Sequence, residues 1–198
     1  TLYHNGTLTI SGSGAMQDYD YNSPAFYNSN IKKVVIEDGV TSIGDNAFPN
    51  CAGLESIEIP SGVTSIGDFA FSRCSSLTSI TIPSSVTSIE ASAFEDCSSL
   101  TSITILGDVT SIGYNAFSDC TSLTSITIPK SVKSIENNAF SGCTALTEVL
   151  LEGGSTLTYT DLGVDANKVV TRWNEGDLTW TLTADGTMTI SGKGAMKD

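Results

Sequence analysis

Five cysteines recur at a fixed spacing of 23 residues, and each follows a phenylalanine by three positions. The pairs are Phe48/Cys51, Phe71/Cys74, Phe94/Cys97, Phe117/Cys120 and Phe140/Cys143. A period between about 20 and 50 residues is typical of a solenoid, in which one supersecondary unit stacks on the next. The spacing therefore predicts a stack of repeats and argues strongly against a compact enzyme fold.

Each unit contains an alternating Ile-x-Ile stretch flanked by serine and threonine. Such alternation is typical of a short strand with one buried face. Successive strands run in the same direction, so we expect them to pair in parallel. The repeats span 31–151, with five full units and a sixth strand at 146–151. Pro60, Pro83 and Pro129 follow the strand, where a missing N–H breaks no ladder bond.

The rest of each unit is too short for a regular helix. The stretch 44–48 and its counterparts predict a turn or a single 3₁₀ turn on the opposite side. One unit buries too little apolar surface to fold alone, so stacking must stabilise it. The expected fold class is a repeat solenoid, with a parallel β-sheet on one face and short turns, 3₁₀ turns or short strands on the other.

The unit L-x-x-I-x-I-P-x-x-V-x-x-I-G-x-x-A-F-x-x-C resembles the BspA-like, 23-residue class of leucine-rich repeats over about 31–151. Common leucine-rich repeats carry an asparagine at the ninth position, and this chain does not, so no asparagine ladder is expected. The residues there are Gly39, Gly62, Ser85, Asp108 and Ser131. The resemblance implies a leucine-rich-repeat-like module of a larger surface or secreted protein, extracellular or on the cell surface and often linked to adhesion.

Residues 1–18 and 181–198 are two copies of one segment, related by an offset of 180. Both copies carry a hairpin turn signal, Asn5-Gly6 and Asp185-Gly186, between alternating stretches. The duplication predicts β-hairpin segments at both ends of the chain. It also suggests that the chain is one module of a longer array.

Four regions follow from these patterns. They are an N-terminal hairpin cap and Tyr-rich loop at 1–30, the repeats at 31–151, a divergent cap or linker at 152–176 and the start of a following module's hairpin at 177–198. The last hairpin is expected either to pack on the strand at 146–151 or to pair with residues 1–4 of another molecule. The second arrangement would give self-association through terminal strands.

Composition excludes several classes of function. The formal net charge of −13 opposes binding to nucleic acid, which needs clustered lysine and arginine. No stretch of 18 apolar residues exists, so no membrane insertion of this segment is expected. His4 is the only histidine, and no nucleophile or orienting group accompanies it in the sequence. We therefore expect no enzyme activity and no cofactor.

The five cysteines could in principle form a metal site or disulfide bonds. No C-x-x-C or Cys/His pair has ligand spacing, which argues against zinc. Stacked units would place neighbouring Cα atoms about 5 Å apart, within reach of a disulfide. Against this, each cysteine occupies an apolar position beside a phenylalanine, and a buried thiol behaves as a small hydrophobe. A structural column of free thiols is favoured, and a disulfide remains the alternative.

A second candidate metal site is Asp18-Tyr19-Asp20-Tyr21-Asn22, which has the spacing of the first half of a calcium loop. Ser23 replaces the turn glycine, Pro24 follows it, and Ser29 replaces the terminal glutamate. A solvated loop is therefore favoured over a metal site.

The strand positions that face away from the buried isoleucines form two polar rows across the sheet. They are Ser56, Glu58, Ser79, Thr81, Ser102, Thr104, Ser125, Thr127 and Glu148. One explanation of serine and threonine here is β propensity and solubility alone. Alternatively, the rows bind a ligand, since solenoids use extended faces for binding. Aromatic residues, the usual anchors, gather instead at Tyr19, Tyr21, Phe26 and Tyr27.

The leading hypothesis is a non-catalytic extracellular repeat module for protein–protein interaction or adhesion to host or neighbouring-cell surfaces. The partner would be a protein, or alternatively a glycan, on another cell or in the matrix. A second hypothesis is a structural spacer or stalk in a multi-domain surface protein, and a glycan-binding module is the third. The three middle units have nearly identical rows, which favours a spacer or weak multivalent contact.

Overall fold

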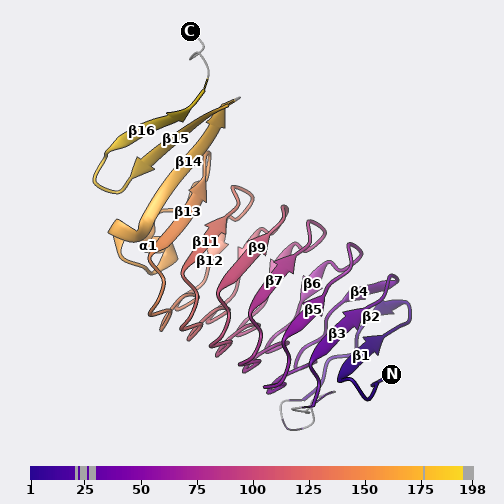
Figure 1. Cartoon of the computed structure of the whole chain (residues 1–198). Coiled ribbons are helices and arrows are strands. Elements are labelled where there is room, and N and C mark those ends of the chain that lie inside the picture. Colours follow the sequence, from indigo (N-terminus) through magenta and orange to yellow (C-terminus); the bar gives the residue numbers. More distant parts are fainter. Residues whose placement is uncertain (21, 23–25, 27–29, 176, 194–198) are drawn as a thin grey trace.

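The computed structural model describes residues 1–20, 22, 26, 30–175 and 177–193. The chain forms a parallel β-solenoid of about seven turns with nearly no helix. Its repeats stack along one direction, and the two termini lie at opposite ends (Figure 1). The predicted fold class is confirmed.

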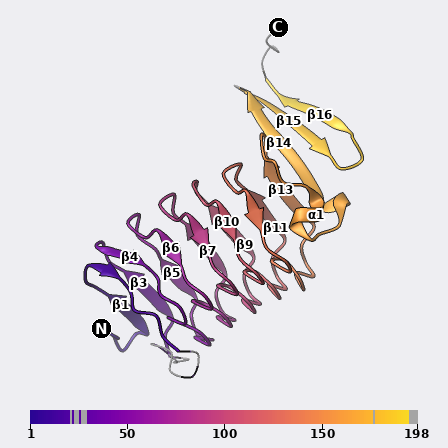
Figure 2. The ribbon, with the colours of Figure 1, turned by 180° about the vertical axis from the view of Figure 1, so that it is seen from behind.

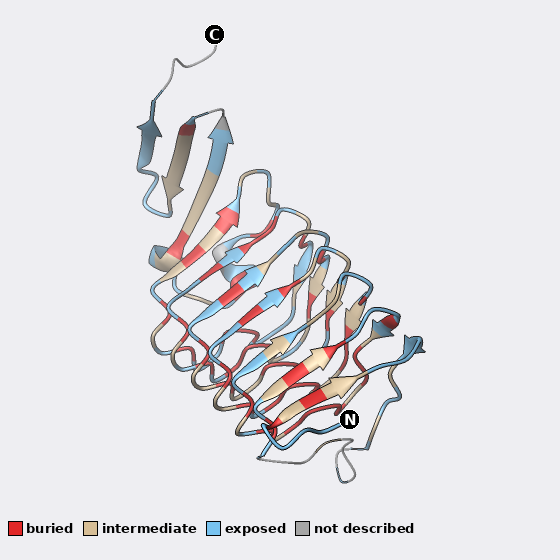
Figure 3. Cartoon of the chain, turned by 45° about the vertical axis from the view of Figure 1, so that its right-hand side comes forward, coloured by how far each residue is buried: buried red, intermediate tan, exposed pale blue. Residues whose placement is uncertain are grey.

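The first side of the solenoid carries one strand from each unit. These strands are β3 (Lys33–Ile36), β5 (Ser56–Glu58), β7 (Ser79–Ile82), β9 (Ser102–Ile105), β11 (Ser125–Ile128) and β13 (Glu148–Glu152). Their pairing is parallel, and equivalent positions oppose one another, as Ile80 opposes Ile103. The isoleucines point inward and the alternate residues outward, which Figure 3 shows as bands of buried and exposed positions.

The parallel ladder on this side is interrupted. The ladder falls into three stretches, β1-β3-β5, β7-β9 and β11-β13-β14. Strands β5 and β7, and strands β9 and β11, still lie side by side (Figures 1 and 2). Strands of three or four residues make only a few slanted parallel bonds, so a small shift between two units interrupts the ladder.

A second, narrower sheet forms the next side. It contains β4 (Val40–Ser42), β6 (Ser65–Ile66), β8 (Ser88–Ile89), β10 (Ser111–Ile112) and β12 (Ser134–Ile135). Strands β6 to β12 pair in parallel, and the bridge between Ile43 and Ile66 continues the stack toward β4. Each two-residue strand points one isoleucine toward the core, and Ile66, Ile89 and Ile112 are buried.

The third side is built from turns that also pair from unit to unit. Each turn contains backbone positions with positive φ, such as Phe69 (54°) and Arg73 (60°), in a region that non-glycine residues seldom adopt. This conformation turns N–H groups toward the following unit. Phe71 N donates to Ala93 O at 2.8 Å, and Arg73 N donates to Glu95 O at 2.7 Å. These bonds offset the strain of the turn and take the place of helical hydrogen bonds.

The core contains two columns that run along the solenoid axis. In one column, six phenylalanine rings stack with centroids 5.3–5.7 Å apart: Phe26, Phe48, Phe71, Phe94, Phe117 and Phe140. The other column is formed by five buried cysteines, which are thiols and not disulfides: Cys51, Cys74, Cys97, Cys120 and Cys143. Each small thiol fills an apolar position and also supplies a weak donor to a backbone carbonyl.

Cys51 departs from the equivalence that the 23-residue period predicts for the five cysteines. The other four thiols contact the carbonyl of a phenylalanine 26 residues earlier, as Cys97 Sγ does at 3.3 Å from Phe71 O. Cys51 Sγ instead lies 2.9 Å from Phe26 O, 25 residues earlier and outside the predicted repeats at 31–151. The acceptor of Cys51 thus comes from the N-terminal region rather than from a preceding unit.

The N-terminal region joins the solenoid rather than lying over it. Residues 1–3 pair antiparallel with β1 (Thr7–Ile10), and β1 pairs in parallel with β3. Strand β2 (Gly14–Ala15) pairs with β4 on the second side. Phe26 stacks on Phe48, so this segment supplies the first ring of the column.

The C-terminal region extends the first sheet. After β13, the chain forms α1 (Tyr159–Leu162) and a 3₁₀ turn at Ala166–Lys168. It then enters β14 (Val169–Glu175), which pairs in parallel with β13. Strands β15 (Leu178–Thr183) and β16 (Met188–Gly192) follow antiparallel. The hairpin therefore attaches to β14 and not directly to the strand at 146–151.

Candidate functional site

The polar strand positions lie together on the outer side of the first sheet. We call Ser79, Thr81, Ser102, Thr104, Ser125 and Thr127 the strand-row face, and all six are exposed. Ser56 and Glu58 continue it toward the N-terminus and are exposed, whereas Glu148 at the other end is half-buried. In-register pairing aligns equivalent hydroxyls of neighbouring strands, as in the pairs Ser79/Ser102 and Thr81/Thr104.

These hydroxyls differ from the threonines elsewhere in the repeats. Thr87 Oγ1 donates to Thr64 O at 3.2 Å, and Thr110 Oγ1 donates to Thr87 O at 3.1 Å, so these side chains tie one unit to the preceding one. In the part of the chain that the structure describes, no hydroxyl of the strand-row face makes a hydrogen bond within the protein. All six can therefore donate and accept toward a ligand.

Charged residues lie at the two ends of this face. At the N-terminal end, Lys33 Nζ and Glu58 Oε1 form an ion pair at 2.5 Å. At the C-terminal end, Glu152 Oε2 accepts a hydrogen bond from Lys130 N at 3.2 Å, and Glu148 lies nearby on the same strand. The centre of the face is uncharged, so a ligand there meets hydroxyl and apolar groups.

Leu106 is an apolar residue beside the strand-row face that the sequence interpretation missed. It follows β9, and its side chain is 51% exposed. Alternation along the strand places it on the side of Ser102 and Thr104. Three other units carry a proline at this position, Pro60, Pro83 and Pro129. That break in the proline pattern was the signal available in the sequence. Unlike proline, Leu106 has a backbone N–H, which donates to Ile82 O at 2.9 Å.

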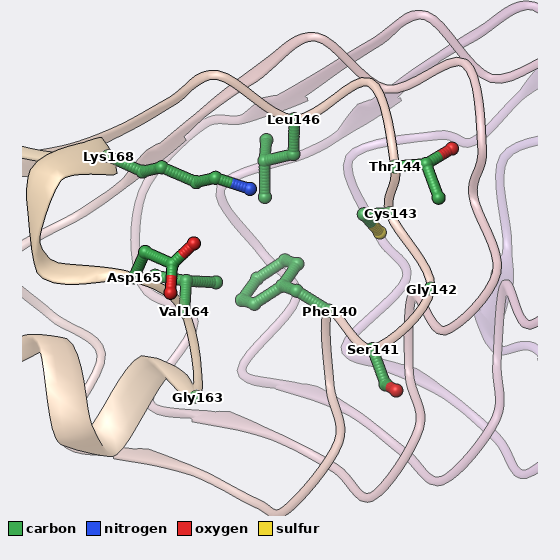
Figure 4. A pocket seen from close by; sticks show the side chains of 10 residues that line it. All are labelled: Phe140, Ser141, Gly142, Cys143, Thr144, Leu146, Gly163, Val164, Asp165 and Lys168. Carbon is green, nitrogen blue, oxygen red and sulfur yellow. The ribbon is translucent and has the colours of Figure 1, made fainter.

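A cavity of about 490 Å³ lies at the C-terminal end of the core. Phe140, the last ring of its column, borders it together with Cys143 and Leu146 from the final unit and Val164 and Lys168 from the segment after α1 (Figure 4). Burial raises the pKa of the Cys143 thiol to about 11, although Lys168 acts in the opposite direction. The thiol is therefore protonated at neutral pH and is not suited to nucleophilic catalysis.

Cys143 is nevertheless expected to be the first thiol to react with a labelling reagent. Burial raises the pKa of Cys74 and Cys97 further, and their side chains are fully enclosed, whereas Cys143 borders the cavity. Timed alkylation of native protein at pH 8, followed by peptide mass spectrometry, would give the order. Labelling of Cys51 or Cys97, both fully buried, before Cys143 would contradict the burial order. Unfolded protein should label at all five positions alike.

Among the residues that the structure describes, the remaining sequence candidates do not assemble into a reactive site. Asp18 Oδ1 accepts a hydrogen bond from Asp45 N at 3.0 Å, which gives this carboxylate a structural role. His4 lies exposed near the N-terminal turn. Within the described ranges, no three His, Cys, Asp or Glu side chains gather as a metal ion would require. Tyr21, Ser23, Pro24, Tyr27 and Ser29, named above for the loop, lie outside the described residues.

None of the helices in the described part of the chain is long and apolar enough to span a bilayer. A comparison with curated proteins gives no match.

Among solved structures, a leucine-rich repeat protein of T. pallidum is 33% identical, with a TM-score of 0.59 over 64% of this chain and 67% of that chain. A leucine-rich repeat protein of Eubacterium ventriosum is 28% identical, with a TM-score of 0.66 over 91% of this chain and 45% of that chain. A leucine rich cell surface protein of Faecalibacterium prausnitzii is also 28% identical, with a TM-score of 0.51. That alignment covers 95% of this chain and 57% of that chain.

The chain thus spans about half the length of the second and third of these proteins. The family model of the BspA type leucine rich repeat region matches residues 20–147 in six copies. This chain belongs to the BspA-type leucine-rich repeat family.

Proposed function

We propose that this chain is a non-catalytic repeat module whose strand-row face binds a protein on another cell or in the extracellular matrix. The observation that carries the proposal is the set of six exposed hydroxyls at equivalent strand positions, in register between β7 and β9 and without a partner in the described chain. Leu106 adds an exposed apolar contact beside them. Interfaces commonly combine apolar contacts with polar groups.

The proposal places the module outside the cell or on its surface. The similar protein of Faecalibacterium prausnitzii is described as a cell surface protein, which supports this location. Thiols in the cysteine column are compatible with an oxidising environment, because burial encloses them and keeps those such as Cys120 protonated.

A spacer is the second candidate function, because the outward rows of the three middle units are nearly identical. A uniform row supplies many equal contacts rather than one tuned site. Such a surface binds through multivalency or not at all. Leu106 is the main departure from this uniformity, so its contribution separates the two functions.

The test uses the purified chain on a panel of immobilised extracellular-matrix proteins and on a glycan array. Thr104→Arg and Leu106→Asp should each weaken binding to a protein at least about tenfold, since Thr104 lies on the middle strand of the face and Leu106 directly follows that strand. Asn137→Arg is the matched control, because Asn137 is exposed on another side of the solenoid. The thermal midpoint should change little in all three variants, since surface substitutions seldom alter stability.

Binding to a matrix protein that survives both face variants would exclude this face as the site. Binding confined to the glycan array would replace the protein partner with a glycan. Absence of binding on both panels would favour the spacer.

A further inference from the structure

The two copies of the duplicated segment fold into the same hairpin. Gly6 and Gly186 have φ of 82° and 84°. Gly6 N donates to Tyr3 O at 3.0 Å, and Gly186 N donates to Thr183 O at 2.9 Å. The side chains of Asn5 and Asp185 both accept a hydrogen bond from the backbone two residues later, at 3.0 and 2.9 Å. The C-terminal copy therefore forms its turn without any repeat beside it.

A repeat covers the N-terminal copy. Strand β1 pairs in parallel with β3, and Leu8 is only 3% exposed. Gly6 O accepts hydrogen bonds from the consecutive N–H groups of Lys32 and Lys33, at 2.8 and 3.2 Å. Ile10 O accepts another from Glu37 N at 2.9 Å. One edge and one face of the hairpin are thus occupied by the first repeat.

The same edge and face are open in the C-terminal copy. Strand β16 ends its sheet and pairs only with β15 in the described part of the chain. Met188 and Ile190, the counterparts of Leu8 and Ile10, are 56% and 43% exposed. A Cβ added to Gly6 would meet Asn30 O at 2.8 Å, whereas one added to Gly186 would meet nothing within 4 Å. Figure 3 shows this hairpin standing clear of the stack.

The open face continues onto β14 and β15. Trp173 and Trp180 oppose each other across these strands, and with Asn174 and Met188 they line a cavity of about 410 Å³. The Nε1–H of Trp180 is enclosed and lacks an acceptor among the described residues. Trp173 and Met188 are exposed, so this face gains from apolar cover.

We infer that β16 is a docking strand for a further block of BspA-type repeats, which pairs in parallel with its outer edge as β3 pairs with β1. The matching segment has the features of Lys32–Ile36, with two consecutive N–H donors followed by inward apolar residues at alternate positions. Such pairing would bury Met188 and Ile190 and join two blocks into one longer solenoid. This inference is independent of whether the strand-row face binds a partner.

A tandem protein tests the inference. The full chain is followed directly by a second copy of residues 19–198, so that residues 181–198 of the first copy replace residues 1–18 of the second. The backbone of β1 shows which amides of the hairpin face the open edge. Thr9 N donates to Thr1 O, and Thr7 O accepts from Tyr3 N, so the backbone N–H and C=O groups of the odd-numbered residues of β1 point toward residues 1–3. The N–H groups of the alternate residues, including Met188 and Ile190 in the C-terminal copy, therefore point to the open edge.

Amide hydrogen exchange followed by NMR is the measurement. The amides of Met188 and Ile190 should exchange rapidly in the single chain and at least about 100-fold more slowly at the junction of the tandem protein. The double variant Met188→Asp/Ile190→Asp should abolish this protection. Thr189→Asp, on the opposite side of the same strand, should retain it. Equal exchange in the single chain and the tandem protein would overturn the inference.

A second tandem protein guards against a folding failure. It joins two complete copies of residues 1–198 through a Gly/Ser linker, so each block keeps its own β1. If this protein folds and the direct fusion does not, the docking strand is refuted. Slow exchange of Met188 in the single chain, with dimers seen in sedimentation, would also refute it, because the occupant would then be a second molecule.

Discussion

Phe94→Ala is expected to lower the free energy of unfolding by about 4 kcal/mol, because it removes a fully buried ring and leaves a cavity. The ring stacks between Phe71 and Phe117, with centroids 5.4 and 5.5 Å away. Strands and turns hold these neighbours in fixed register, so they cannot collapse into the gap. Urea titration followed by circular dichroism would measure the loss.

Two further variants separate ring stacking from a general effect of losing an aromatic residue. Tyr114→Ala removes an exposed ring from the next unit and should cost at most about 0.5 kcal/mol. Phe26→Ala should cost less than Phe94→Ala, because Phe26 is half-buried and, among the described residues, stacks on Phe48 alone. Equal losses in Phe94→Ala and Tyr114→Ala would contradict the role of the phenylalanine column.

The protein is expected to lose stability steeply above about pH 9. Burial raises the pKa of Cys74, Cys97 and Cys120 well above 9.0, the ordinary value, and that of Cys143 to about 11. Between pH 9 and 11 the unfolded chain releases these thiol protons, whereas the folded chain retains them. The unfolded state then binds fewer protons, so the free energy of unfolding falls as the pH rises.

The expected slope is large because four thiols act together. Each contributes at most about 1.4 kcal/mol per pH unit, a limit approached one unit above the ordinary value, so the set approaches roughly 5 kcal/mol per unit near pH 10 and less below it. Denaturant titrations at pH 8, 9 and 10, with reductant present, would measure it. Cys97→Ala should reduce the slope by about a quarter, whatever its effect on stability at neutral pH. An unchanged slope in this variant would show that Cys97 ionises equally in both states.

The period of the sequence was sufficient to predict the stacked strands and the phenylalanine and cysteine columns, because these contacts repeat every 23 residues. Strand β14 was not predicted, because it does not follow this period. It opposes β13 at an offset of 20 residues, as in the pair Val149 and Val169, and it lacks the A-F-x-x-C core. The turn conformation was also hidden, since Phe69 and Arg73 are unusual residues for a positive φ. Hydrogen bonds between units select it there.

The contact of Cys51 with Phe26 could not be predicted from the period, because Phe26 does not follow it. Phe26 precedes Phe48 by 22 residues and not by 23, and no cysteine follows it three positions later. The ring nevertheless stacks on Phe48 with centroids 5.4 Å apart. An aromatic residue can thus complete a column from a segment that lacks the rest of the repeat pattern.

The candidate site could be predicted only in part. Alternation along the strands identified the outward residues, including Thr81 and Thr104. The sequence could not separate them from threonines such as Thr87, whose hydroxyl bonds to Thr64 O in the preceding unit. That distinction depends on the distance between units, which the sequence does not state. The break in the proline pattern marks Leu106, but it does not predict that the side chain is 51% exposed.

Contacts between units join equivalent positions throughout the stack, as the bonds from Thr87 to Thr64 and from Thr110 to Thr87 illustrate. Loss or duplication of one 23-residue unit would therefore recreate the same set of contacts across the new boundary. Recombination between the repeated stretches of the gene can thus change the length of the solenoid in whole units of 69 nucleotides without opening its core. Each such event would lengthen or shorten the strand-row face by one strand spacing, about 4.8 Å.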